Sequence, residues 1–96
     1  MLTLTSEAVR AVVDLVVAQD PAAGAGLRIS AGPPSAFEQT WNYVVVREPR
    51  EGDVVIEDGP ARVFVDPDAA QQLERAVLDA HSGEDTLEPR FVVRMG

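Results

Sequence analysis

The sequence contains no cysteine, no lysine and a single histidine among its 96 residues. Without cysteine, these residues cannot form disulfides, thiolate-bound zinc sites, cysteine nucleophiles or cysteine-ligated iron–sulfur clusters. No apolar run approaches the roughly 20 residues that span a bilayer, and no basic stretch followed by an apolar core opens the sequence. We therefore expect a cytoplasmic protein with no membrane partner.

Acidic residues outnumber basic ones, which gives a formal net charge of −8. All eight basic residues are arginines, and they are scattered between Arg10 and Arg94. A nucleic-acid partner would require clustered basic side chains that displace counterions from phosphates, so we expect none. An acidic surface is most simply explained by solubility. The length fits one domain, 1–96, with one modest hydrophobic core.

A predicted hairpin around Asp58-Gly59 is the clearest local pattern. Residues 54–57 and 62–65 are rich in Val, Ile and Phe and alternate with a period of two, which is typical of paired strands with one face on a core. Asp-Gly is a turn signal, whereas Pro60 pushes the residue before it toward extended backbone. We therefore expect a loop of about three to five residues instead of a two-residue turn.

Two helices are expected, one on each side of this hairpin. The first covers 6–18, with Thr5 or Ser6 as the N-cap, and should bury a stripe of valines: Val9, Val12, Val13, Val16 and Val17. The second begins at Asp66-Pro67, an N-cap followed by proline at the first helical position, and should run to about Arg75. Its expected buried residues are Ala70 and Leu73.

Apolar, aromatic and β-branched residues gather in four short segments, which we predict to be strands: 1–5, 27–30, 41–47 and 90–95. The segment 76–81 is ambiguous between a last helical turn and a strand. We expect loops at 31–40, where two prolines cannot donate to a sheet ladder, and at 82–88.

Several short motifs follow one another in order: Leu4-Thr5, Gly26-Leu27-Arg28-Ile29, Glu48-Pro49 before Gly52-Asp53-Val54-Val55, Val63-Phe64-Val65-Asp66, and Leu73 before Leu78-Asp79. Their order and spacing resemble the HesB/IscA-like family of A-type iron–sulfur cluster carriers. The resemblance implies a mainly β (α+β) fold, a flattened β sandwich or pseudo-barrel with an N-terminal helix and a second helix after the central hairpin. It also implies protein partners from iron–sulfur assembly, and homodimers or larger assemblies.

The same resemblance implies which ligands are missing. The carriers place one cysteine in the loop after the Gly-Leu-Arg strand and two more in a C-terminal Cys-x-Cys. Here the loop position is Ala36, and the other two would lie beyond Arg94, where the sequence stops at Gly96. The family's glycine at the helix end is Arg75. Because alanine cannot ligate iron, we expect no cluster and no other cofactor. Loss of the cluster leaves the oligomeric state open.

Other side chains are weaker candidates for chemistry. Glu38, Asp79 and His81 are possible carboxylate and imidazole ligands for iron or another divalent ion, although a lone histidine is most simply a surface loop residue. The aromatic residues Phe37, Trp41 and Tyr43 are candidate anchors for a protein partner. For the last two, packing on a sheet face is the simpler interpretation.

Two functional hypotheses result, and an enzyme ranks below both. The first is a non-catalytic accessory or protein-interaction role related to iron–sulfur cluster assembly. The alternative is a protein that binds iron or another divalent ion through carboxylates. One histidine, no cysteine and no lysine leave few groups that could serve as nucleophile or base.

Overall fold

The structure is a computed structural model, and it describes residues 2–19, 24–32, 41–81 and 90–95. The elements in chain order are β1 (Thr3–Leu4), α1 (Ser6–Gln19), β2 (Gly26–Ala31), β3 (Trp41–Val46), β4 (Val54–Asp58), β5 (Ala61–Val65), α2 (Pro67–Gln72), β6 (Ala76–His81) and β7 (Arg90–Met95). The ligand position Ala36, its neighbours Phe37 and Glu38, and the predicted loop at 82–88 lie outside the described residues.

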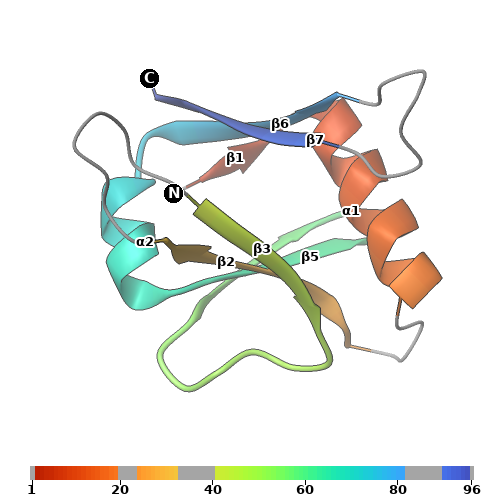
Figure 1. Cartoon of the computed structure of the whole chain (residues 1–96), viewed down its shortest axis with the longest axis horizontal. Coiled ribbons are helices and arrows are strands. Elements are labelled where there is room, and N and C mark those ends of the chain that lie inside the picture. Colours follow the sequence, from red (N-terminus) through yellow and green to blue (C-terminus); the bar gives the residue numbers. More distant parts are fainter. Residues whose placement is uncertain (1, 20–23, 33–40, 82–89, 96) are drawn as a thin grey trace.

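The described strands form two sheets (Figure 1). One has the order β1-β6-β7, in which β1 is parallel and β7 antiparallel to β6. The other has the order β3-β2-β5-β4, in which β2 and β5 are parallel and both outer pairs are antiparallel. Neither sheet closes into a barrel. The arrangement confirms the predicted mainly β fold with two helices.

Helix α1 packs against both sheets, since it contacts β5 of one sheet and β6 of the other. Helix α2 lies at the opposite side of the molecule (Figure 1). Thr5 is the N-cap of α1, since its Oγ1 accepts a hydrogen bond of 3.1 Å from the Ala8 amide. Both helices are too short or too polar to cross a bilayer.

The predicted valine stripe of α1 is only partly correct. The buried residues are Ala8, Ala11 and Val12, whereas Val17 is 61% exposed. Val17 lies five positions after Val12, and a helix with about 3.6 residues per turn places the two roughly 140° apart. The small alanines, which hydrophobicity alone did not single out, are what let the helix approach the sheets closely.

The predicted hairpin is present, but the prediction of a longer loop is wrong. Asp58 pairs directly with Ala61, so Gly59 and Pro60 form a two-residue turn. Gly59 has φ +57°, the positive value that a type II′ turn needs at its first central position, and the ring of Pro60 fixes the negative φ of the second. The ring of a proline clashes with the Cβ of the residue before it. Because glycine has no Cβ, Gly59 can precede Pro60 in this turn.

The second helix is shorter than predicted. It ends at Gln72, and Leu73 is its C-cap, so the chain turns into β6 instead of continuing to Arg75. Asp66 is the predicted N-cap, and its side chain accepts from the amides of Asp68 and Ala69. Ala69 is fully buried together with Leu73, whereas Ala70, the predicted core residue, is only partly buried.

The hydrophobic core lies between α1, α2 and the facing sides of both sheets. Its largest fully buried residues include Leu27, Ile29, Val63, Leu73 and Leu78. Phe64 is also fully buried, but it points to the other face of the four-stranded sheet, because side chains alternate along a strand. We expected only one face of this hairpin to be buried, and the burial of Phe64 shows that its other face is also covered at this residue.

Candidate functional site

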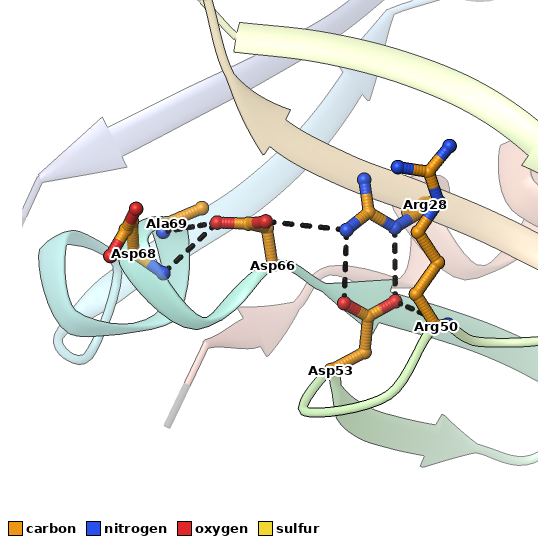
Figure 2. A network of polar contacts seen from close by, with 6 residues as sticks. All are labelled: Arg28, Arg50, Asp53, Asp66, Asp68 and Ala69. Atoms are coloured by element: carbon orange, nitrogen blue, oxygen red, sulfur yellow. Dashed lines mark hydrogen bonds and ion pairs between the residues drawn. The ribbon is translucent and has the colours of Figure 1, made fainter.

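A network of charged side chains on the four-stranded sheet centres on Arg28 of β2 (Figure 2). Its Nε and Nη2 donate to the two carboxylate oxygens of Asp53, each at 3.0 Å, and Nη2 also contacts Asp66 at 3.2 Å. The carboxylate of Asp53 accepts a further bond of 3.0 Å from the Arg50 amide. The network thus joins β2, the turn before β4 and the first turn of α2.

The protonation states in this network are set by their mutual contacts. The Asp53 side chain is 0% exposed, and burial alone would raise the pKa of its carboxyl. The hydrogen bonds from Arg28 and from the Arg50 amide outweigh this, so the pKa lies below its ordinary value. The hydrogen bond to Asp53 likewise raises the pKa of Arg28 despite partial burial. Both groups are therefore charged near neutral pH.

A second network lies on the three-stranded sheet around Asp79 of β6. Its Oδ1 accepts 2.7 Å and 2.8 Å hydrogen bonds from the Thr5 hydroxyl and the Ala80 amide. Its Oδ2 lies 2.7 Å from Arg94 Nη2 on β7 and 4.0 Å from His81 Nε2. The bond from Thr5, followed by the Ala80 amide, lowers the pKa of this buried carboxyl.

The two networks contain five polar residues of the motifs that resemble the carrier family: Thr5, Arg28, Asp53, Asp66 and Asp79. Arg28, Asp53 and Asp66 meet in one network, and Thr5 meets Asp79 in the other. Sequence reasoning treated these residues as separate motifs and did not predict that they would meet. The motifs therefore mark contacts that hold the two sheets and the helix ends in place.

The predicted metal candidates do not form a metal site among the described residues. Asp79 and His81 are neighbours on one face of β6, but the Asp79 oxygens already accept three shorter contacts. Glu38 lies outside the described residues. In the part of the chain that the structure describes, no group of three or more His, Cys, Asp or Glu side chains could hold a metal ion.

The two described aromatic candidates lie on β3, at one edge of the four-stranded sheet. The Tyr43 ring stacks on Phe91 of β7 with centroids 5.3 Å apart and an interplanar angle of 27°. Burial raises the pKa of the Tyr43 hydroxyl. Trp41 is half-buried and packs on the core. Both side chains therefore contribute to packing and keep part of their surface exposed.

A recess of about 380 Å³ lies on the outer side of β2 and β3, next to the Arg28 network. Its described lining is mixed in character: Arg28, Ser30, Asn42, Tyr43, Val44, Val46 and Arg50. It offers guanidinium, hydroxyl and amide donors, but Arg28 is already paired with two carboxylates. The remaining donors can contact polar or acidic groups.

The sequence matches no protein-family model. It is 32% identical over 88 residues to the uncharacterized protein y4vC of Sinorhizobium fredii, and this match covers 90% of the chain and 80% of y4vC.

Solved structures share the fold. Escherichia coli SufA, which is involved in the biosynthesis of iron–sulfur clusters, matches with a TM-score of 0.76 and 24% identity, over 97% of this chain and 78% of SufA. IscA with a [2Fe-2S] cluster matches with a TM-score of 0.73 and 20% identity, over 99% of this chain and 85% of IscA. A protein from Aquifex aeolicus matches with a TM-score of 0.76 and 23% identity, over 99% of this chain and 91% of that protein. The chain therefore belongs to one family with y4vC, and it is a divergent, cysteine-free protein with the HesB/IscA-like fold of SufA and IscA.

Proposed function

We propose that this chain is a non-catalytic protein of iron–sulfur biogenesis that acts by binding protein partners and carries no cluster of its own. The observation that supports this most strongly is the combination of a complete scaffold with absent ligands. The Arg28 and Asp79 networks are intact, whereas the 96 residues contain no cysteine and have Ala36 at the ligand position. Clusters of this kind are held by thiolates, which alanine cannot replace.

Partner binding would use the aromatic residues near the start of β3. Phe37, Trp41 and Tyr43 are the candidate anchors, because aromatic side chains are enriched at the energetic centres of interfaces. Trp41 begins an edge strand and is only half-buried, which supports this assignment. A cytoplasmic location and a homodimer are parts of the same proposal. Sedimentation analysis would measure the oligomeric state directly.

The absence of a cluster is tested by anaerobic reconstitution. The purified chain is incubated with iron and sulfide, desalted, and examined by visible absorption and iron analysis. We expect no stable charge-transfer bands and less than about one tenth of an iron per chain, since iron–sulfur ligation requires thiolates. IscA, whose solved structure contains a [2Fe-2S] cluster, is treated in parallel as the positive control. A stable chromophore on this chain would contradict the proposal.

The interaction role is tested by affinity capture from the native cell. A tagged chain and its Trp41→Ala variant are compared, with captured proteins identified by mass spectrometry. We expect the wild-type chain to enrich proteins of iron–sulfur assembly and the variant to lose them, because removing an aromatic anchor costs about 2 kcal/mol or more at an interface centre. The Val17→Ala variant is the matched control, as Val17 is exposed on α1.

Divalent-ion binding through carboxylates is the alternative proposal, with less support. Asp79 is occupied by Thr5, Ala80 and Arg94, so binding would cost those contacts. Calorimetric titration with Fe²⁺ measures it, and an absence of saturable heat would remove this alternative.

A further inference from the structure

The outer edge of β4 combines exposed apolar residues with unpaired backbone. Among the described strands, β4 pairs only with β5, so its other edge faces no strand. Val54 and Val55 are 39% and 42% exposed, on opposite faces of this edge. Proteins usually protect such edges with charges, proline or a covering element, because an open apolar edge accepts strands from other chains. Among the described residues no strand covers Val54 or Val55, and the charged residues of β4 are confined to its C-terminal end at Glu57 and Asp58.

A cavity of about 240 Å³ opens beside the same edge. Val54 and Ile56 of β4 line it, together with Val65, Ala70 and Leu73. A dry apolar cavity of about 150 Å³ is large enough to hold benzene, so this one can accept a leucine or phenylalanine side chain. Strand addition with a pocket for alternate side chains is a known mode of peptide recognition, in which the backbone supplies affinity and the pocket specificity.

The charges around this edge are acidic. Asp58 is the charged residue of β4 on the cavity face, and Glu74 is the charged residue among the described lining of the cavity. Glu57 lies on the opposite face of β4 and is paired with Arg62 at 3.2 Å. The whole chain has a net charge of −8. An incoming segment is therefore favoured if basic residues flank its apolar residues, because opposite charges across an interface guide association and select partners.

A second copy of this chain is a poor occupant of the edge. In a two-fold antiparallel pair centred on Val55, Glu57 of one copy would face Asp53 of the other. A pair centred on Ile56 would place Glu57 opposite Val55 and Asp58 opposite Val54. In the first register Glu57 would face a residue whose carboxylate is buried and already paired with Arg28, and in the second the acid–valine pairs lose the apolar contact.

We propose that β4 is a docking edge for an extended segment of another protein, in which a large apolar residue enters the cavity and lysine or arginine flanks it. The inference rests on the proposed function, because it names the kind of partner segment that an interaction role would engage. It adds a second contact surface to the one that contains Trp41 and Tyr43.

The probe is the end-blocked, fluorescein-labelled peptide Lys-Val-Phe-Val-Lys. In an added strand its phenylalanine and both lysines share the cavity face, and its valines share the face of Val55. Two control peptides have the same length: Glu-Val-Phe-Val-Glu reverses the charge, and a version N-methylated at alternate residues removes the backbone donors. Fluorescence polarisation measures binding, and ¹⁵N–¹H spectra report which amides shift.

Two variants remove the edge or the cavity separately. Val54→Asp charges the edge, and Ala70→Phe fills the cavity while leaving β4 unchanged. Val17→Asp and Val44→Asp are matched controls, since both valines are exposed on other elements. Thermal melting confirms that each variant is folded before binding is measured.

We expect saturable binding of the basic peptide to the wild-type chain, with shifts confined to β4 and its neighbours. Val54→Asp and Ala70→Phe should each weaken it at least about tenfold, a change of about 1.4 kcal/mol, and both controls should leave it unchanged. The proposal is overturned by any of three results. These are no binding to the folded wild-type chain, equal binding of the charge-reversed peptide, or a wild-type dimer that Val54→Asp dissociates.

Affinity capture separates this inference from the proposed function. If the wild-type chain and Val54→Asp capture the same assembly proteins equally well, the docking edge is wrong and the proposed function stands. If the peptide binds β4 but capture finds no assembly protein, the edge stands and the proposed function fails.

Discussion

Replacing Asp53 by alanine should lower the free energy of unfolding by about 3 kcal/mol, the lower end of the range for breaking a buried ion pair. The change removes two 3.0 Å contacts with Arg28 and one with the Arg50 amide. It also leaves Arg28, whose side chain is only 12% exposed, with Asp66 at 3.2 Å as its remaining carboxylate in this network. That second partner keeps the loss below the upper end of the range.

Urea titration and thermal melting measure the loss. For a domain of this size, about 3 kcal/mol corresponds to a decrease in Tm of roughly 12–24 °C. Asp14→Ala is the matched control, because Asp14 is exposed on α1 and its removal should change stability by less than about 0.5 kcal/mol. In a double-mutant cycle with Arg28→Met, the two losses should be non-additive by about 1–3 kcal/mol.

The pH dependence provides a second check on the same residue. The pKa of Asp53 is lowered in the folded protein from its ordinary value of 3.8. Its contribution is therefore fully present above that value, and it is lost as the pH falls through the folded-state pKa. The stability difference between wild type and Asp53→Ala should be constant from neutral pH to about pH 5 and narrow below about pH 4. A difference under about 1 kcal/mol at pH 7, or one that persists unchanged at pH 2.5, would refute the reasoning.

Two further substitutions test packing and capping. Gly26→Ala should lower the free energy of unfolding by about 1–3 kcal/mol, because a Cβ at this position would lie 2.6 Å from the Arg62 carbonyl oxygen. Urea titration measures the loss, and unchanged stability would show that β5 can move away. Thr5→Val should lower the Tm by several degrees, because it removes the N-cap of α1. It should also raise the pKa of Asp79 toward its ordinary value, because it removes the Thr5 hydrogen bond that lowers this pKa. Thr5→Ser retains the hydroxyl and should change neither, and carboxyl NMR titration measures the pKa.

Much of the fold could be predicted from local pattern. The period of two in 54–65 identified the hairpin, and Asp66-Pro67 identified the start of α2, because both signals depend on neighbouring residues. The turn at Gly59 was predicted wrongly, since the restriction imposed by Pro60 was applied to a residue that lacks a Cβ. The buried face of α1 was predicted only in part: Val12 is buried, but Ala8 and Ala11 were missed because alanine carries little hydrophobic signal, and Val17 is exposed.

The candidate site was less predictable, because its contacts join distant parts of the chain. Thr5 and Asp79 are 74 positions apart, and no local pattern indicates that they meet. Asp79 and His81 were recognisable as neighbours on one strand face, but the partners that occupy Asp79 were not. The apolar cavity beside β4 was also missed, since it needs β4, β5 and α2 together.

The parallel pairing of β1 with β6 has a consequence for the order in which the chain can fold during synthesis. Thr3 pairs with Val77 and Leu4 with Leu78, so β1 lacks this partner until the chain through Leu78 has left the ribosome. Contacts between such distant segments slow folding, because the intervening loop must close first. β1 must therefore wait, with α1 unsupported on its β6 side, until β6 has been synthesised.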